Sequence, residues 1–168
     1  FSEFIPDVPW AGKYNAINCP AAHHFAEARW LKDPKYLDAY ARFWCSPDGT
    51  PRSYSFPISD AVLKFYKVHD DLGLIKDIYP RLKEIYAEWE GDHRGEEGLF
   101  WQMDDRDGME VSISGSLSPD CTGYRPTINS YMYADAKALS EMATLLGNEA
   151  DASLYAAKAD TVKSLIDN

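Results

Sequence analysis

Four carboxyl side chains lie within seven residues of one another near the centre of the sequence. Asp104, Asp105, Asp107 and Glu110 occur among aromatic residues and glycines. Neighbouring negative charges raise the pKa of a carboxyl group, and a carboxylic acid that stays protonated near neutral pH can donate a proton to a departing oxygen. The segment could therefore do general acid chemistry. A solvated turn and a calcium site at the three aspartates are the alternatives, although the spacing of an EF-hand is absent.

Residues on both sides of this segment could complete a pocket for a sugar. Such a pocket needs an aromatic platform and planar hydrogen-bonding groups that match pairs of hydroxyls. The sequence supplies both kinds of group in Trp101, Tyr124, Arg125, Asn129 and Tyr133. Aromatic residues make up 14% of the chain, which suits a stacking site and equally a helical core rich in tyrosine.

Two other groups of residues could bind a metal or form disulfides. His23 and Glu27 lie four residues apart, on one face of a predicted helix, but no third ligand is apparent and His24 points to another face. The cysteines are odd in number and lack the CxxC spacing of a metal knuckle: Cys19, Cys45 and Cys121. We therefore expect no metal centre there, and the redox compartment stays open.

Composition excludes several classes of partner. The chain has 168 residues, 45% of them hydrophobic, which is enough for one globular domain. Its net charge of −10 repels phosphate backbones and anionic lipid headgroups, so we expect neither nucleic acid nor a membrane as partner. No apolar run approaches about 18 residues and no leader precedes Phe1, so we also expect no membrane span, no intact signal peptide, and a processed or excised chain.

The elements that must position these residues are helices in pairs. Apolar residues recur at helical spacing in three hairpins, at about 20–45, 58–90 and 128–167. Asp33-Pro34 and Gly147-Asn148 are typical helix boundaries. Between them, residues 91–127 lose the helical period, and loops of that length within a domain are usually functional. The pattern predicts an all-α chain, with short β segments allowed inside the long loop.

The loop itself resembles the acid loop of the six-hairpin glycosidases of the trehalase and family 63 α-glucosidase type. Those loops read roughly Glu-Ser-Gly-(Trp/Met)-Asp-x-Ser, and residues 107–112 here read Asp-Gly-Met-Glu-Val-Ser. The resemblance implies that Glu110 is the general acid and that Asp107 lies in the substrate site. Here Glu replaces the family's Asp, and its side chain is one methylene longer.

The resemblance continues on both sides of the loop. The segment 124–133 is similar to the one that follows the acid loop in the trehalases, and Asn129 matches an Asn that lies at their pocket. The segment 52–57, Arg-Ser-Tyr-Ser-Phe-Pro, is similar to a stretch that binds sugar hydroxyls, which implies a substrate contact for Arg52.

By resemblance, the fold is an (α/α)6 toroid of which this chain is about half. The activity implied is exo-acting hydrolysis, with inversion, of α-linked glucosides or related oligosaccharides, without a cofactor. Inversion needs a second carboxylate about 6.5–9.5 Å from the acid, and the family places that base in a later hairpin outside this chain. We therefore expect the remainder of the barrel as a partner, an inactive isolated chain, and a secreted or periplasmic location rather than a cytoplasmic one.

Two structural expectations follow. Glu110 should face a concave surface near Trp101 and Asn129, and half a barrel should expose a large apolar strip along one side. A different class of function is a carbohydrate-binding or scaffold module that kept the helical frame and lost catalysis.

Overall fold

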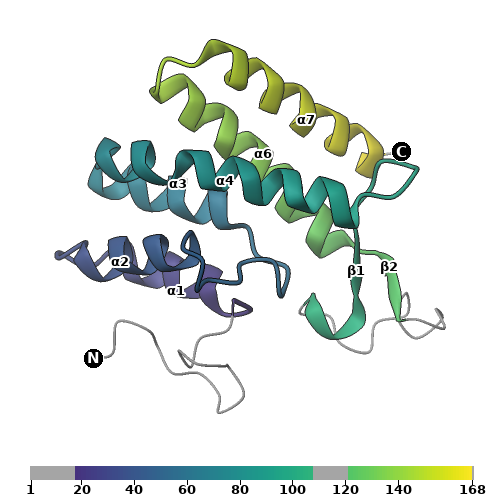
Figure 1. The fold of residues 1–168 in the computed structure, drawn as a ribbon, viewed down its shortest axis with the longest axis horizontal. Coiled ribbons are helices and arrows are strands. Elements are labelled where there is room, and N and C mark those ends of the chain that lie inside the picture. The colour runs from purple at the N-terminus through teal and green to yellow at the C-terminus, as the bar shows by residue number, and fades with distance from the viewer. Residues whose placement is uncertain (1–17, 108–120, 168) are drawn as a thin grey trace.

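The computed structural model describes residues 18–107 and 121–167, which form three helical hairpins and one short β-hairpin (Figure 1). The helices and strands, in chain order, are α1 (Ala21–Ala28), α2 (Lys35–Trp44), α3 (Ile58–His69), α4 (Leu72–His93), β1 (Trp101–Met103), β2 (Thr122–Tyr124), α6 (Pro126–Leu145) and α7 (Glu149–Asp167). The prediction of an all-α chain of the helical-barrel type is confirmed, and the short β segments lie inside the long loop, as the sequence allowed.

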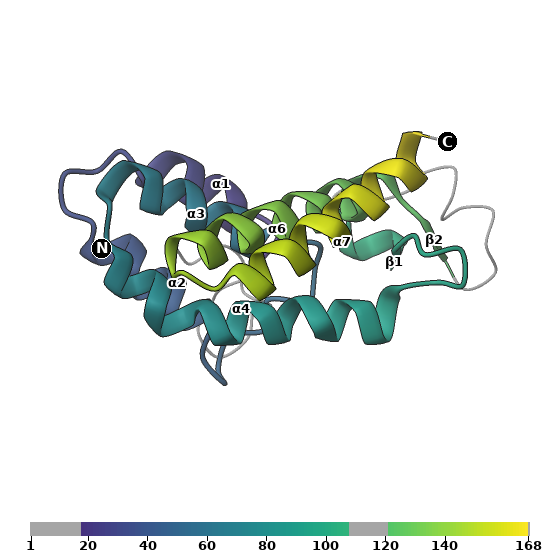
Figure 2. The same cartoon turned by 90° about the horizontal axis from the view of Figure 1, so that it is seen from above.

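The helices form two layers (Figure 2). In one layer α3 packs between α1 and α6, and α4 contacts both α3 and α6 from the second layer. Ion pairs join α4 to its neighbours in that layer: Arg42 of α2 contacts Asp77 at 2.9 Å, and Lys83 contacts Asp151 of α7 at 2.8 Å. Each hairpin thus contributes one helix to each layer, as in an α/α barrel.

The connections differ in length at the two ends of the molecule. Short turns join the helices within each hairpin, as at 146–148, where Gly147 adopts a φ of 73° and the Asn148 side chain accepts a hydrogen bond from the Asp151 amide at 3.1 Å. The longer segments 45–57 and 94–125 join one hairpin to the next. Figure 1 shows their described residues, 45–57, 94–107 and 121–125, at the opposite end from these turns. The candidate residues within those ranges therefore lie at one end of the helices.

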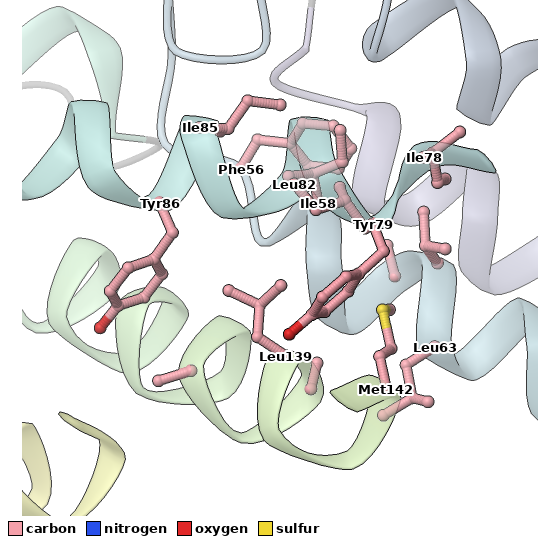
Figure 3. Close-up of a cluster of buried hydrophobic side chains, with 14 of the residues drawn as sticks. Phe56, Ile58, Leu63, Ile78, Tyr79, Leu82, Ile85, Tyr86, Leu139 and Met142 are labelled. Atoms are coloured by element: carbon pink, nitrogen blue, oxygen red, sulfur yellow. The ribbon is translucent and has the colours of Figure 1, made fainter. Parts of the chain in front are cut away.

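An apolar core fills the space between the layers. Figure 3 shows Leu82, Tyr79 and Tyr86 of α4 facing Leu139 and Met142 of α6. All five residues are at most 5% exposed. This packing fixes α4 and α6 against each other, the helices that precede and follow the long loop in the sequence.

A buried carboxylate links the two central helices of the first layer. The residue before α3 is Pro57, which supplies no side-chain cap, and Asp135 of α6 accepts a hydrogen bond from the Asp60 amide at 2.9 Å. A negative group at a helix N-terminus is favourable because it meets unpaired amide hydrogens and the positive end of the helix dipole. Burial nevertheless raises the pKa of Asp135 well above its usual value.

The large exposed apolar side chains are distributed over several elements in the described part of the chain. Those outside the β-hairpin lie on or just after four different helices: Trp30, Leu31, Val68, Leu145, Leu154 and Ile166. The surface between α1, α3 and α6 instead carries several alanines and charged residues. Within residues 18–107 and 121–167, no helix has both the length and the apolarity needed to cross a bilayer.

Candidate functional site

Buried polar side chains gather at the base of the long loop, where the segments 101–107 and 121–125 meet. Eight polar or charged residues are buried in the described part of the chain, and five of them lie here: Ser55, Gln102, Asp107, Arg125 and Asn129. Burying polar groups is costly unless each is hydrogen-bonded, so such a concentration marks a place where geometry must be maintained.

Ser55 holds the first stem of the loop, which is the segment 104–107. Its hydroxyl donates a short hydrogen bond to Asp107 Oδ1, and its backbone amide donates to the Arg106 carbonyl at 2.8 Å. The Gln102 side-chain amide donates to the same hydroxyl at 3.4 Å. The segment before α3 thus fixes the chain at Asp107, three residues before Glu110.

Arg125 holds the second stem of the loop, which is the segment 121–125. Its side chain is fully buried. Its guanidinium donates to Asp104 Oδ1 at 2.6 Å and to the Gln102 carbonyl at 3.2 Å. The Asp104 amide in turn donates to the Cys121 carbonyl at 2.8 Å, which closes the base of the loop. A charge-assisted pair of this kind is strong where water is excluded. Arg125 therefore ties the two ends of the loop together.

Asn129 anchors the β-hairpin to α6. Its side-chain amide donates to the carbonyls of Phe100 and Arg125 at 2.7 and 2.8 Å, and its Oδ1 accepts from the Phe100 amide at 2.8 Å. Four per cent of the residue is exposed. These bonds make Asn129 a support of the loop base.

An aromatic column lies beside the loop. The ring of His93 is 4.4 Å from that of Trp101 and 4.6 Å from that of Trp89. His93 Nδ1 donates to the Trp101 carbonyl at 3.0 Å, and burial, with the charge of Arg52, lowers the pKa of His93. Trp101 pairs across the hairpin with Tyr124, and the two strands line an open hollow of about 370 Å³. The pair offers flat faces of the kind that stack on sugar rings.

The structure places the other two predicted substrate residues further from this centre. Arg52 forms ion pairs with Glu88 at 3.4 Å and with Asp92, and its guanidinium lies 5.2 Å from the ring of Trp89. Tyr133 packs against the apolar core, with the Lys137 ammonium 5.6 Å from its ring. The loop base therefore brings together Trp101, Asp107, Tyr124, Arg125 and Asn129, with Arg52 at the end of the aromatic column.

Glu110 lies outside the described residues. The expectation that it faces a concave surface near Trp101 and Asn129 therefore stays a prediction. The three aspartates near it do not converge: Asp104 binds Arg125, Asp107 binds Ser55, and Asp105 is exposed, 3.9 Å from Arg106. No group of three His, Cys, Asp or Glu side chains in the described ranges could hold a metal ion. His24 instead contacts the Tyr40 hydroxyl at 3.0 Å.

The three cysteines form no disulfide with one another, and burial raises the pKa of the Cys45 thiol to about 12.

Ser55, Gln102 and His93 are functional candidates that the sequence analysis did not single out. Their signals in the sequence are weak: Ser55 precedes the Phe-Pro that comes directly before α3, and Gln102 is the inward residue of a three-residue strand. Neither signal identifies the residue that the side chain bonds to, because Ser55 and its hydrogen-bond acceptor Asp107 are 52 residues apart in the chain.

Comparison with known proteins relates this chain to glycoside hydrolases. Residues 13–168 match the model of the family described as the mannosylglycerate hydrolase MGH1-like glycoside hydrolase domain. A solved structure named "Sialidase" is 45% identical over 99% of this chain, with a TM-score of 0.87, and the chain spans 16% of that protein's length. No curated protein matches. Neither description names a trehalase or a family 63 enzyme.

Proposed function

Because the chain belongs to the family of the mannosylglycerate hydrolase MGH1-like glycoside hydrolase domain, we propose that it supplies the acid side of an O-glycosidase active site. Glu110 is the general acid that protonates the departing glycosidic oxygen. The observation that carries this proposal is the buried network at the loop base, which fixes the backbone at Asp107, three residues before Glu110.

The roles of the surrounding residues follow from their contacts. Trp101 and Tyr124 present aromatic faces beside the loop and stack on the substrate. Asp107, Arg125 and Asn129 are engaged with the protein itself, and they keep the loop in the geometry that the acid needs.

The reaction proposed is exo-acting hydrolysis, with inversion, of α-linked glucosides or related oligosaccharides. The resemblance to trehalases and family 63 α-glucosidases supports this reaction. The second carboxylate, which activates water, comes from protein outside this chain. The solved relative with "Sialidase" in its name makes a sialoside a second substrate to test.

The test is to change Glu110 to Gln in the intact protein. Gln keeps the shape of the side chain but has no proton acidic enough to give the leaving oxygen, and general acid catalysis contributes about 10²–10⁴-fold. We expect kcat on an unactivated glycoside to fall at least about 100-fold, with a much smaller loss on an aryl glycoside whose leaving group needs no protonation. The substrates are an α-glucoside, a mannosylglycerate and a sialoside, each assayed by sugar release.

Glu141→Gln is the matched control, because Glu141 is an exposed residue of α6 that forms an ion pair with Lys67. This variant should keep wild-type rates. Normal turnover of an unactivated glycoside by the Glu110→Gln protein would remove Glu110 from the mechanism. An intact protein that binds saccharides but hydrolyses none would instead be a carbohydrate-binding module.

A further inference from the structure

A groove of about 340 Å³ runs between α1, α3 and α6, away from the hollow beside the β-hairpin. Its apolar wall consists mainly of small residues and a proline, and its polar lining of four side chains: Arg29, Asp60, Lys64 and Tyr131. A volume of this size lies at the lower end of the range for small-molecule sites, which is about 300–1,000 Å³. The groove is thus large enough to receive part of a ligand.

Tyr131 connects the groove with the loop base. It is half-buried, it lines the groove, and burial together with the negative charge of Asp107 raises its pKa. Pro57 also lines the groove, and it is two residues after Ser55, which bonds to Asp107. A ligand in the groove therefore lies next to the segment that holds Asp107 in place.

Tyr131 and Tyr133 cannot serve the same surface, although they are only two positions apart in the sequence. An α-helix turns about 100° per residue, so side chains at positions i and i+2 point to nearly opposite sides. Tyr133 accordingly packs against the apolar core beside Lys137, whereas Tyr131 faces the groove. The aromatic residue of α6 that can contact a ligand in this groove is Tyr131.

Arg29 supplies an unused hydrogen-bond donor in the same groove. Its Nε atom is buried and has no hydrogen-bond partner among the described residues. Lys64 differs, because its ammonium is paired with Asp60. A buried donor without a partner is costly, and the Arg29 side chain, which lines the groove, has further guanidinium hydrogens that can bond to a hydroxyl of a bound sugar. Ala22, Ala26 and Ala134 leave the space that such a ring needs.

We propose that this groove receives a sugar ring of the substrate, with Tyr131 and Arg29 as the residues that bind its hydroxyls. This inference rests on the proposed glycosidase function and adds the surface on which the substrate lies.

The first test compares Tyr131→Phe with Tyr133→Phe in the intact protein. Each change removes one phenolic hydroxyl from α6. Loss of a sugar hydrogen bond from Tyr131 should lower kcat/KM about 10-fold, mainly through KM, whereas Tyr133→Phe should leave both constants unchanged. Equal behaviour of the two variants would overturn the assignment of Tyr131.

The second test fills the groove without disturbing the core. Ala26 lines the groove and is exposed, so Ala26→Leu narrows it, and Ala156→Leu makes the same change at an exposed position of α7. Binding of a sulfur-linked, non-hydrolysable α-glucoside is followed by tryptophan fluorescence. We expect at least about 10-fold weaker binding for Ala26→Leu alone, at an unchanged melting temperature.

The outcomes separate the two proposals. If Glu110→Gln loses activity as expected but Tyr131→Phe and Ala26→Leu match their controls, the groove assignment is wrong and the glycosidase proposal stands. If the wild-type protein neither hydrolyses the test glycosides nor binds their sulfur-linked analogues, both proposals fall.

Discussion

Ser55 is the residue whose contacts have the clearest consequence for chemistry. Through its amide and its hydroxyl it holds two consecutive residues of the loop stem, Arg106 and Asp107, and Gln102 holds the hydroxyl in turn. The hydroxyl is buried and bonds to the last described residue before Glu110, so it acts on the acid through the backbone at Asp107. Ser55 is therefore a positioning residue for the proposed acid.

Changing Ser55 to Ala should lower kcat about 10-fold and leave KM nearly unchanged, because misplacing the acid affects the chemical step more than binding. Removing one partner of a buried hydrogen bond should also cost about 1–3 kcal/mol of stability. Steady-state kinetics and thermal unfolding of the intact protein measure the two effects. Ser153→Ala, at an exposed position of α7, is the control. Wild-type kcat in a Ser55→Ala protein that is fully folded would show that the bond does not position the acid.

At the scale of elements, the contact of Asp135 with the start of α3 shows how one helix completes another. Pro57 cannot cap α3 with a side chain, and Asp135 supplies the missing acceptor from α6. Burial raises the pKa of Asp135, so the folded chain binds a proton at this site more tightly than the unfolded chain does. Its contribution to stability is then greatest below the unfolded pKa of about 3.8 and declines as the pH rises through the folded pKa.

The stability difference between wild type and Asp135→Asn should therefore decrease from pH 4 to pH 7. Asn keeps an oxygen that can accept from the Asp60 amide but carries no charge to desolvate. Asp135→Ala should destabilise the chain by about 1–3 kcal/mol at pH 4, since it leaves the amide unpaired, and by less at pH 7, where the wild-type carboxylate is itself penalised by burial. Urea unfolding of the 1–168 chain at the two pH values measures all three proteins. A difference that grows with pH would show that the carboxylate is stabilised, not penalised, at this site.

The elements themselves were largely predictable, and their side-chain contacts were not. Helical periodicity and boundary residues such as Gly147 and Asn148 predicted helical hairpins at about 20–45, 58–90 and 128–167, and the structure has its helices within 21–44, 58–93 and 126–167. Such signals can be read from the sequence because they are local. The pairing of Trp101 with Tyr124 is not local, since a three-residue strand has no periodicity that fixes its register.

The same limit applies to the candidate site. The composition of the loop and the resemblance to known loops indicated Arg125 and Asn129, and the structure shows that both bind the protein's own backbone. Their proposed contact with substrate is still a prediction. The choice between Tyr131 and Tyr133 depends on which face of α6 packs on the core, and the neighbouring helices decide that face.

At the scale of the whole molecule, the chain carries a core of its own together with part of a site. Large side chains such as Trp44, Trp89 and Phe65 are at most 2% exposed, and they lie between helices that are all present here. The chain nevertheless spans 16% of the solved relative's length. The helices needed for an apolar core are therefore present in this chain, whereas the proposed catalysis also needs a carboxylate from outside it.

The isolated 1–168 chain should fold and yet be inactive. Its helices bury their apolar residues against one another, but the proposed mechanism needs a second carboxylate from elsewhere. Circular dichroism at 222 nm with cooperative thermal unfolding tests folding, and sugar release from the best substrate of the intact protein tests activity. Turnover by the isolated chain, at a rate above that of its Glu110→Gln variant, would show that both catalytic groups lie within it.

The unequal connections at the two ends of the helices have a practical consequence. The turn at Gly147-Asn148 is exposed and lies at the opposite end of the helices from the loop, separated from it by the length of α6 (Figure 1). A fluorophore or a surface-attachment tag placed in this turn would lie at the far end of α6 from the β-hairpin (Figure 1). Immobilised in this orientation, the protein could be screened against arrays of many glycans at once, so that its natural ligand is found without choosing one sugar beforehand.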